Sequence, residues 1–121
     1  LRPGSTAGRV DDVPTVTTSE EIAAVADQLS RLHVADPILR YVREIGTTIR
    51  RDPRVRVGVS TRGLKALVGC LQVYAAARGR NYVVPSDVQR LAEPVLAHRT
   101  VLARDAVLAG HTSEGVIHEV L

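Results

Sequence analysis

The strongest constraint on the fold is a long stretch of helical character that follows Ser60. Ser60 is a good N-cap, residues 61–78 then carry apolar side chains at helical spacing, and Gly79 suits the left-handed position after a helix end. This is the longest apolar face in the chain, so we expect this helix to be central. The face consists of Leu64, Leu67, Val68, Leu71, Tyr74 and Ala75.

Two helices are predicted before the central one. Thr18 and Glu21 form a capping box, in which a hydroxyl and a carboxylate satisfy N–H groups at the helix start. The first helix ends near His33, and the second begins with Asp36 as its cap and Pro37 at its first position. Their apolar stripes are Ile22, Val25, Ala26, Leu29 and Leu32 in the first helix, and Ile38, Tyr41, Val42, Ile45 and Ile49 in the second.

A fourth helix is predicted to open at Pro85. Ser86 with Gln89 could cap it one turn later, and Pro94 should bend or break it after residue 92 or 93. Thr112 then caps a last helix that carries Val116, Ile117, Val120 and Leu121.

Short extended pieces are expected at residues 55–57, 82–84 and 101–102. Together with the helices they indicate a mainly α fold, a small helical bundle with a few short strands that pair as a minor sheet. Residues 1–14 lack hydrophobic periodicity and are predicted to be a poorly ordered linker, which leaves residues 15–121 as one helical domain.

Composition narrows the possible functions. The core must be aliphatic, because the chain has three Tyr and neither Phe nor Trp. The single cysteine, Cys70, fits a reducing cytoplasm and is interpreted as a small core residue and not as a nucleophile. No apolar run is long enough to span a membrane, and we see no signal peptide.

The chain is expected to be a fragment, because it begins with Leu and contains no Met. It carries neither the glycine-rich phosphate loop of nucleotide hydrolases nor an apolar strand that ends in paired acids to hold Mg²⁺. We therefore expect that the fragment alone does not hydrolyse nucleotide.

Positive charge gathers between the second and third predicted helices. The net charge of the chain is +3, and Lys65 is its one lysine. Three explanations stay open from the residues alone: a nucleotide phosphate, an acidic neighbouring subunit, or nucleic acid. The basic residues in this region are Arg50, Arg51, Arg54, Arg56, Arg62 and Lys65, with Asp52 as the sole acid.

Arg62 and Lys65 stand at the start of the central helix, where the helix dipole is positive and disfavours cations by a few tenths of a kcal/mol. Either the two side chains extend into solvent, or an anion lies close to them. The residues alone favour neither interpretation.

Metal and hydrolase sites receive little support. The four histidines, at positions 33, 98, 111 and 118, show no ligand spacing on one helix, so we expect no metal site. Ser60, His98 and Asp87 could be imagined as a catalytic triad, but no spacing supports it and Ser60 already has a capping role.

Four segments carry a resemblance to a known family. Residues 58–63 read Gly-Val-Ser-Thr-Arg-Gly against a family pattern of Gly-Ala-Ser-Pro-Arg-Ala, and residues 78–83 read Arg-Gly-Arg-Asn-Tyr-Val. Residues 84–88 read Val-Pro-Ser-Asp-Val, and residues 92–99 read Ala-Glu-Pro-Val-Leu-Ala-His-Arg. From about residue 13 to residue 121 the chain resembles the C-terminal lid domain of MoxR-type AAA+ ATPases, with residues 58–99 as the specific part.

The resemblance implies a lid that closes over ATP bound to an AAA+ core domain absent from this chain. It assigns Arg62 as sensor 2, a catalytic arginine that contacts phosphate in its own or a neighbouring subunit, with Ser60 and Lys65 beside the nucleotide. ATP and Mg²⁺ would belong to the complete protein, with none bound by the fragment alone. The complete protein would be an ATP hydrolase and chaperone in protein maturation or metal insertion, acting as a cytoplasmic homo-hexamer, with von Willebrand factor A domain proteins as partners.

The sequence departs from the family pattern at several helix starts. Thr61 replaces the proline before the arginine, Gly63 replaces the following alanine, and Val84 replaces a capping threonine. The alternative function is a free-standing, basic, helical nucleic-acid-binding domain. Against it, no aromatic residues alternate with the arginines for base stacking, and the net charge is modest.

Overall fold

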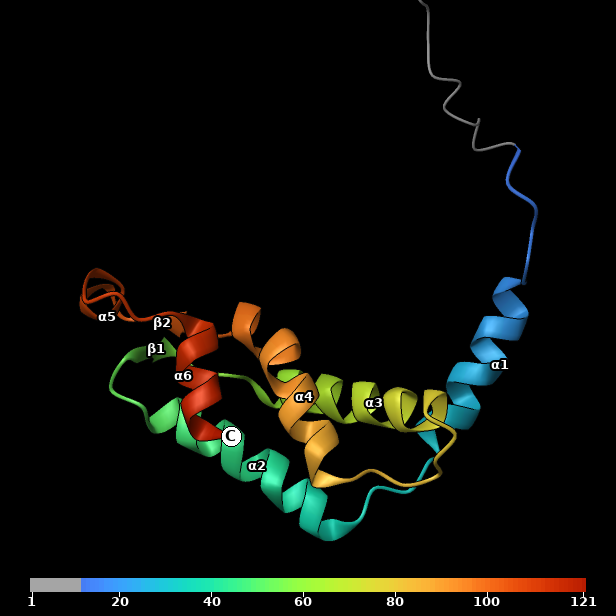
Figure 1. Cartoon of the computed structure of the whole chain (residues 1–121), viewed down its shortest axis with the longest axis horizontal. Coiled ribbons are helices and arrows are strands. Elements are labelled where there is room, and N and C mark those ends of the chain that lie inside the picture. The colour runs from blue at the N-terminus through green and yellow to red at the C-terminus, as the bar shows by residue number, and fades with distance from the viewer. Residues whose placement is uncertain (1–11) are drawn as a thin grey trace, which may run out of the picture.

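Helices connected by short segments make up most of the computed structural model, which describes residues 12–121 (Figure 1). The predicted linker, residues 1–14, lies almost wholly outside the described residues, and its order stays a prediction. In chain order the elements are α1 (Ser19–Ser30), α2 (Asp36–Arg51), β1 (Val55–Val57), α3 (Thr61–Ala77), α4 (Pro85–Leu96), the 3₁₀ helix η2 (Ala97–Arg99), β2 (Val101–Leu102), α5 (Arg104–Leu108) and α6 (Ser113–Val120).

The core lies where α2, α3, α4 and α6 meet. Figure 1 shows α3 crossing the middle of the molecule with α2 and α4 beside it, while α1 and α5 lie at opposite ends. The predicted central position of α3 and the mainly helical fold are therefore confirmed. The core is aliphatic, as the composition requires, and its fully buried large side chains are Ile45, Ile49, Leu67, Leu71, Leu96, Ile117, Val59, Val88 and Val116.

Local capping signals predicted the helix starts well. Thr18 and Glu21 form the expected reciprocal capping box, and Ser60 Oγ accepts a hydrogen bond from the Gly63 N–H at 3.2 Å. Thr112 caps α6 in the same way. In α2, by contrast, Asp36 lies at the first helical position and the N-cap is Ala35, without a side-chain cap bond.

Glycine ends α3 as predicted. Gly79 has a φ of 72°, and the Arg80 N–H bonds to the Ala75 carbonyl, which satisfies a carbonyl group at the helix end. Gly110, with a φ of 90°, ends α5 by the same arrangement. Helix α5 itself was not predicted, because five residues with one buried side chain, Ala106, are too few to show a helical period.

A single two-stranded antiparallel sheet pairs β1 with β2 among the described residues, with Val55 opposite Leu102 and Val57 opposite Val101. This pairing of the predicted pieces at residues 55–57 and 101–102 is confirmed. The third piece, residues 82–84, forms no strand, and Val84 instead serves as the N-cap of α4.

The expected Ser86 cap of α4 was wrong, and so was the expected break at Pro94, whereas a bend at Pro94 stays a prediction. Ser86 does not cap the helix, because Val84 occupies the cap position and its N–H donates to the Asp87 carboxylate at 3.0 Å. Pro94 does not end the helix, which continues to Leu96. Ala92 and Leu96 are both fully buried, so core packing on either side of Pro94 offsets the hydrogen bond that proline cannot donate.

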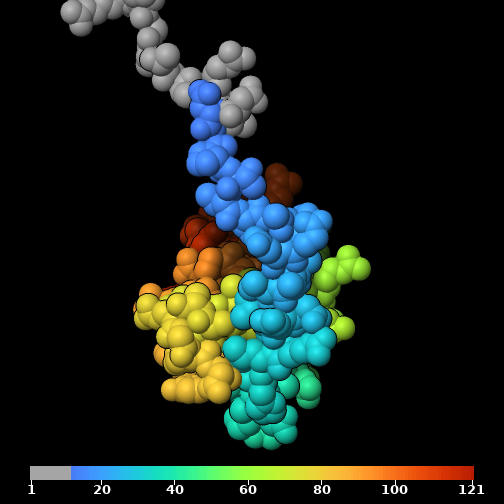
Figure 2. All heavy atoms as spheres, turned by 90° about the vertical axis from the view of Figure 1, so that its right-hand side faces the viewer, coloured from blue at the N-terminus to red at the C-terminus, as the bar shows by residue number. Residues whose placement is uncertain are grey.

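Helix α1 has the predicted stripe but does not bury it. Ile22 and Val25 are 58 % and 53 % exposed, and Figure 2 shows α1 at the surface of the molecule. The helix packs on α3, where Gln72 donates hydrogen bonds to the carbonyls of Ser30 and Leu32 at 3.1 and 2.8 Å. Its contacts are thus made at its C-terminal end, and its first turns extend beyond the core.

Cys70 is exposed, so its interpretation as a core residue was wrong. The buried line of α3 runs through Leu67, Leu71 and Ala75. Because successive residues of a helix are 100° apart, Cys70 is turned away from this line and lies on the surface between α3 and α4.

Gly58 is required where the chain enters α3. A Cβ at this position would lie 2.9 Å from the Arg50 Cα, a backbone atom that cannot move aside. We expect Gly58→Ala to lower the free energy of unfolding by about 1–3 kcal/mol. Gly69→Ala is the matched control, since a Cβ there meets nothing within 4 Å and alanine favours the helix. Urea denaturation checks both variants, and equal stabilities would contradict the packing argument.

Candidate functional site

The first turn of α3 is open to an anion. Ser60 uses its hydroxyl to cap the Gly63 N–H, and the Leu64 N–H bonds to the Ser60 carbonyl. The N–H groups of Thr61 and Arg62 make no hydrogen bond to any described residue. This turn contains no acidic residue, in contrast to the first turns of α1, α2 and α4. The helix start therefore presents free donors and positive charge without an internal counter-ion.

Arg62 is the second residue of α3, and its side chain is exposed. Within residues 12–121 its guanidinium makes no hydrogen bond, ion pair or ring contact. A guanidinium presents several donors in one plane, which suits the oxygens of a phosphate or carboxylate. Arg62, which the sequence analysis selected, is thus accessible, and its guanidinium has no partner in the described part of the chain.

Lys65 lies on the same side of α3, three residues from Arg62, and is also exposed. It lines a cleft between α2 and α3 together with Arg50, whereas Arg62 is not among the lining residues. The predicted set of Ser60, Arg62 and Lys65 is therefore brought together at one helix start, but the two cations face partly different surroundings.

Structure adds Arg99 to this region, a connection that sequence reasoning missed. A Cβ at Gly63 would lie 3.1 Å from the Arg99 Cδ, so the arginine side chain lies across the first turn of α3. Arg99 also donates to the Val95 carbonyl at 3.0 Å and contacts the His98 ring. The carbonyl bond satisfies an acceptor at the C-terminal end of α4. The sequence did contain one signal for this contact. Gly63 replaces the alanine of the family pattern, and a glycine permits the close approach of the arginine side chain.

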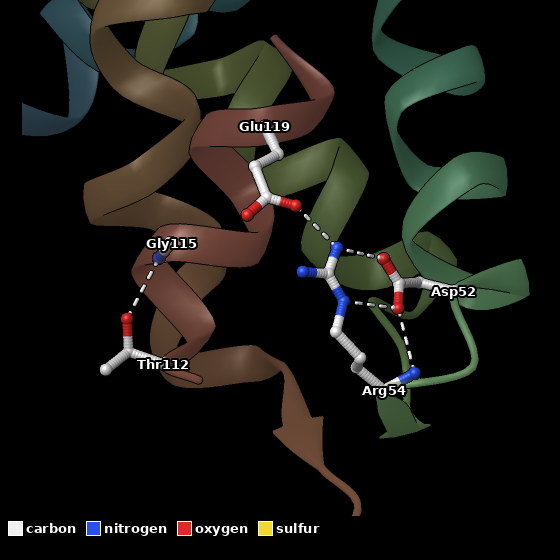
Figure 3. Close-up of polar contacts among 5 residues, drawn as sticks. All are labelled: Asp52, Arg54, Thr112, Gly115 and Glu119. Carbon is white, nitrogen blue, oxygen red and sulfur yellow. Dashed lines mark hydrogen bonds and ion pairs between the residues drawn. The ribbon is translucent and has the colours of Figure 1, made fainter. Parts of the chain in front are cut away.

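The predicted basic region is not one continuous cationic surface. Arg54 forms ion pairs with Asp52 and Glu119, both at 2.7 Å, and so connects the segment before β1 to α6 (Figure 3). Arg50 donates to the Val59 carbonyl at 3.0 Å. Hydrogen bonding from Arg54 lowers the pKa values of the Asp52 and Glu119 carboxyl groups, so these pairs are ionised at neutral pH. Arg54 is thus a structural residue.

Other kinds of site find no support in the described residues. Residues 12–121 contain no group of three His, Cys, Asp or Glu side chains that could hold a metal ion. Asp87 is bound to Arg80 and Val84, so it is not available to a triad with Ser60 and His98. Among the same residues, no helix has the length and apolar character needed to cross a bilayer.

Comparison with known proteins identifies the domain. Residues 48–120 match the family model described as the AAA lid domain. The chain is 32 % identical over 112 residues to the uncharacterized protein YeaC of Bacillus subtilis, covering 93 % of this chain and 35 % of YeaC. It is 39 % identical over 67 residues to the chaperone MoxR1 of Mycobacterium tuberculosis, covering 55 % of this chain and 18 % of that protein.

Two further matches agree with these. The protein MoxR of Paracoccus denitrificans is 31 % identical over 87 residues, covering 61 % of this chain and 26 % of that protein. The crystal structure of a candidate ATPase from Cytophaga hutchinsonii superposes with a TM-score of 0.78 at 20 % identity, over 84 % of this chain and 33 % of that one, which shows a shared fold.

The chain spans about a third or less of the length of the relatives that it matches. Neither the family model nor the relatives support the alternative of a nucleic-acid-binding domain. The family model, the relatives and the mainly helical bundle agree with one another, and the chain belongs to the AAA lid domain family as the lid of a MoxR-like AAA+ ATPase.

Proposed function

We propose that this lid closes over ATP held by an AAA+ core domain and that Arg62 contacts the γ-phosphate as sensor 2. One observation carries the proposal. Arg62 is an exposed cation, without a partner in residues 12–121, on the first turn of a helix whose leading N–H groups are free of protein partners there. A cation at this end of a helix is unfavourable unless an anion compensates it.

The residues present fit a phosphate group but not its metal ion. Arg62 and Lys65 supply positive charge, and the Thr61 and Arg62 N–H groups supply donors, all of which suit phosphate oxygens. Mg²⁺ prefers carboxylate oxygens, and the first turn of α3 has none. ATP with Mg²⁺ would supply the transferable phosphoryl group, and both would be held by the core domain.

Within this scheme each residue has a physical task. Arg62 stabilises the negative charge that spreads over the γ-phosphoryl oxygens as the bond to the leaving group breaks. Lys65 adds charge one turn further along α3, and Ser60 holds the helix start in place through its bond to the Gly63 N–H. Arg99 lies beside Gly63 and fixes the end of η2 against the same turn.

For the complete protein, meaning this chain with its core domain, we propose an ATP-hydrolysing chaperone. The support is the similarity to proteins named chaperone MoxR1 and MoxR. We further propose a cytoplasmic homo-hexamer, in which Arg62 serves its own or a neighbouring subunit. Its clients would be proteins with von Willebrand factor A domains, matured by folding or metal insertion.

Hydrogen exchange on the complete protein tests the lid function. With a non-hydrolysable ATP analogue and Mg²⁺, we expect slower amide exchange at residues 61–65 than without nucleotide, because phosphate oxygens and the core would cover these N–H groups. Residues 74–77, at the opposite end of α3, are the internal control and should not change. Unchanged exchange at residues 61–65 with saturating nucleotide would refute closure at this helix start.

A further inference from the structure

A cleft with a cationic lining lies beside the first turn of α3. Between α2 and α3 is a cleft of about 380 Å³. Each helix contributes one face, with side chains at the spacing of successive turns. The lining residues are Leu39, Val42, Arg43 and Arg50 from α2, and Thr61, Leu64, Lys65 and Val68 from α3.

The charge of this cleft is unbalanced. Its lining includes three cations, Arg43, Arg50 and Lys65, and no acidic residue. Arg50 is held in place, because it donates to the Val59 carbonyl at 3.0 Å and to the Thr47 hydroxyl at 3.4 Å. Within residues 12–121, Arg43 and Lys65 form no ion pair. Three cations in a lining without an acidic residue favour a ligand with more than one negative charge.

Apart from the cations and Thr61, the lining is aliphatic. Leu39 is 36 % exposed, and Val42, Leu64 and Val68 continue the apolar surface toward the core. None of the eight lining residues is aromatic, so a nucleobase would find no ring to stack on. A ligand that fits both parts of the cleft carries an aliphatic anchor next to carboxylates.

From these features we propose that the cleft binds an acidic, leucine-bearing peptide segment of a partner protein. The leucine would occupy the aliphatic surface, and its flanking carboxylates would pair with Arg43, Arg50 and Lys65. The cleft shares Thr61 and Lys65 with the proposed phosphate contact, but Arg62 does not line it. The proposal therefore does not depend on the sensor role of Arg62.

Peptide titration tests the proposal on the chain of residues 1–121. The first probe is a fluorescent helical peptide in which pairs of Leu alternate with pairs of Glu. The second probe is the same peptide with every Glu replaced by Gln. We expect fluorescence anisotropy to show that the Glu peptide binds more than about tenfold tighter than the Gln peptide. Lys65→Glu and Leu39→Ser should each weaken the Glu peptide, the first by more than about tenfold.

Two controls make the result decisive. Arg90→Glu changes the net charge equally but lies on α4 away from the cleft lining, so it should leave binding unchanged. Arg104→Ala removes an exposed arginine of α5 outside the cleft lining and should also leave binding unchanged. Lys65→Glu should fold normally, because Glu is favoured near a helix N-terminus. Equal weakening by Lys65→Glu and Arg90→Glu, or displacement of the peptide by ATP, would overturn the proposal.

Discussion

Replacing Arg62 with alanine in the complete protein is expected to slow ATP hydrolysis by about a hundredfold or more, as the loss of other charged transition-state contacts does. The lid itself should fold normally, because Arg62 is exposed and has no partner among the described residues. Thermal stability should stay the same or rise slightly, since the variant removes a cation from the positive end of the α3 dipole.

Steady-state ATP turnover and a thermal melt of the same sample measure both expectations. Arg90→Ala is the matched control, because it removes an exposed arginine from α4 that lies outside the site. Arg62→Lys should recover only part of the rate, since lysine keeps the charge but loses the planar donor set. Normal turnover in a folded Arg62→Ala protein would show that this arginine is not a sensor.

Asp87→Ala is expected to have the largest effect on stability, a loss of about 3–5 kcal/mol in the free energy of unfolding. Asp87 is 4 % exposed, and its carboxylate accepts hydrogen bonds from Arg80 at 2.8 and 2.9 Å. The same carboxylate accepts from the Val84 N–H at 3.0 Å and so caps α4. The alanine variant leaves a partly buried guanidinium unpaired and removes the cap.

A double-mutant cycle with Arg80→Ala separates the ion pair from the cap. Arg80→Ala leaves the Asp87 carboxylate buried with its cap bond intact, so the double variant should lose less than the sum of the two single losses. Denaturant unfolding of the wild type, the two single variants and the double variant gives the coupling energy between Arg80 and Asp87. If the two single losses of stability add up to the loss of the double variant, the ion pair contributes no coupling energy.

The same pair makes stability fall in acid. Burial raises the pKa of Asp87, but the hydrogen bonds from Arg80 and Val84 outweigh it and hold the pKa below its ordinary value. The unfolded chain therefore binds this proton more readily than the folded one does. The contribution is fully present above the ordinary carboxyl pKa and is lost as pH falls through the lowered value. The Asp87→Asn variant has no carboxyl group to protonate at this position. Its free energy of unfolding should therefore fall less than that of the wild type as the pH is lowered over this range.

Sequence predicted the features that depend on near neighbours. The capping residues Thr18, Ser60 and Thr112 and the helix stop at Gly79 follow from chemistry within a few residues, and all four are confirmed. The expected break at Pro94 was wrong because Ala92 and Leu96 are buried on either side of it. This tertiary packing keeps α4 helical beyond the proline. Cys70 was placed in the core because it is a small residue, although the predicted apolar face of α3 already left it out; the buried residues of α3 follow that predicted face.

The candidate site was predicted in part. Arg62 and Lys65 were selected because cations at a helix start are disfavoured by the dipole, and the family resemblance added Ser60 and the phosphate role. The structure places the two cations in the first turns of α3 with Ser60 as its N-cap. The approach of Arg99 to Gly63 joins segments 36 residues apart and could not be read from local pattern. Arg80 directly follows the helix stop at Gly79, and its pairing with Asp87 across the connection to α4 appears only in three dimensions.

The most direct test of the account is the distance from the Arg62 guanidinium to the nucleotide in the complete protein. A structure with a non-hydrolysable ATP analogue and Mg²⁺ would give it. We predict that a guanidinium nitrogen lies about 2.7–3.2 Å from a γ-phosphate oxygen of its own or a neighbouring subunit. A nucleotide bound in the core with Arg62 beyond reach of every phosphate would contradict the proposed role of this lid.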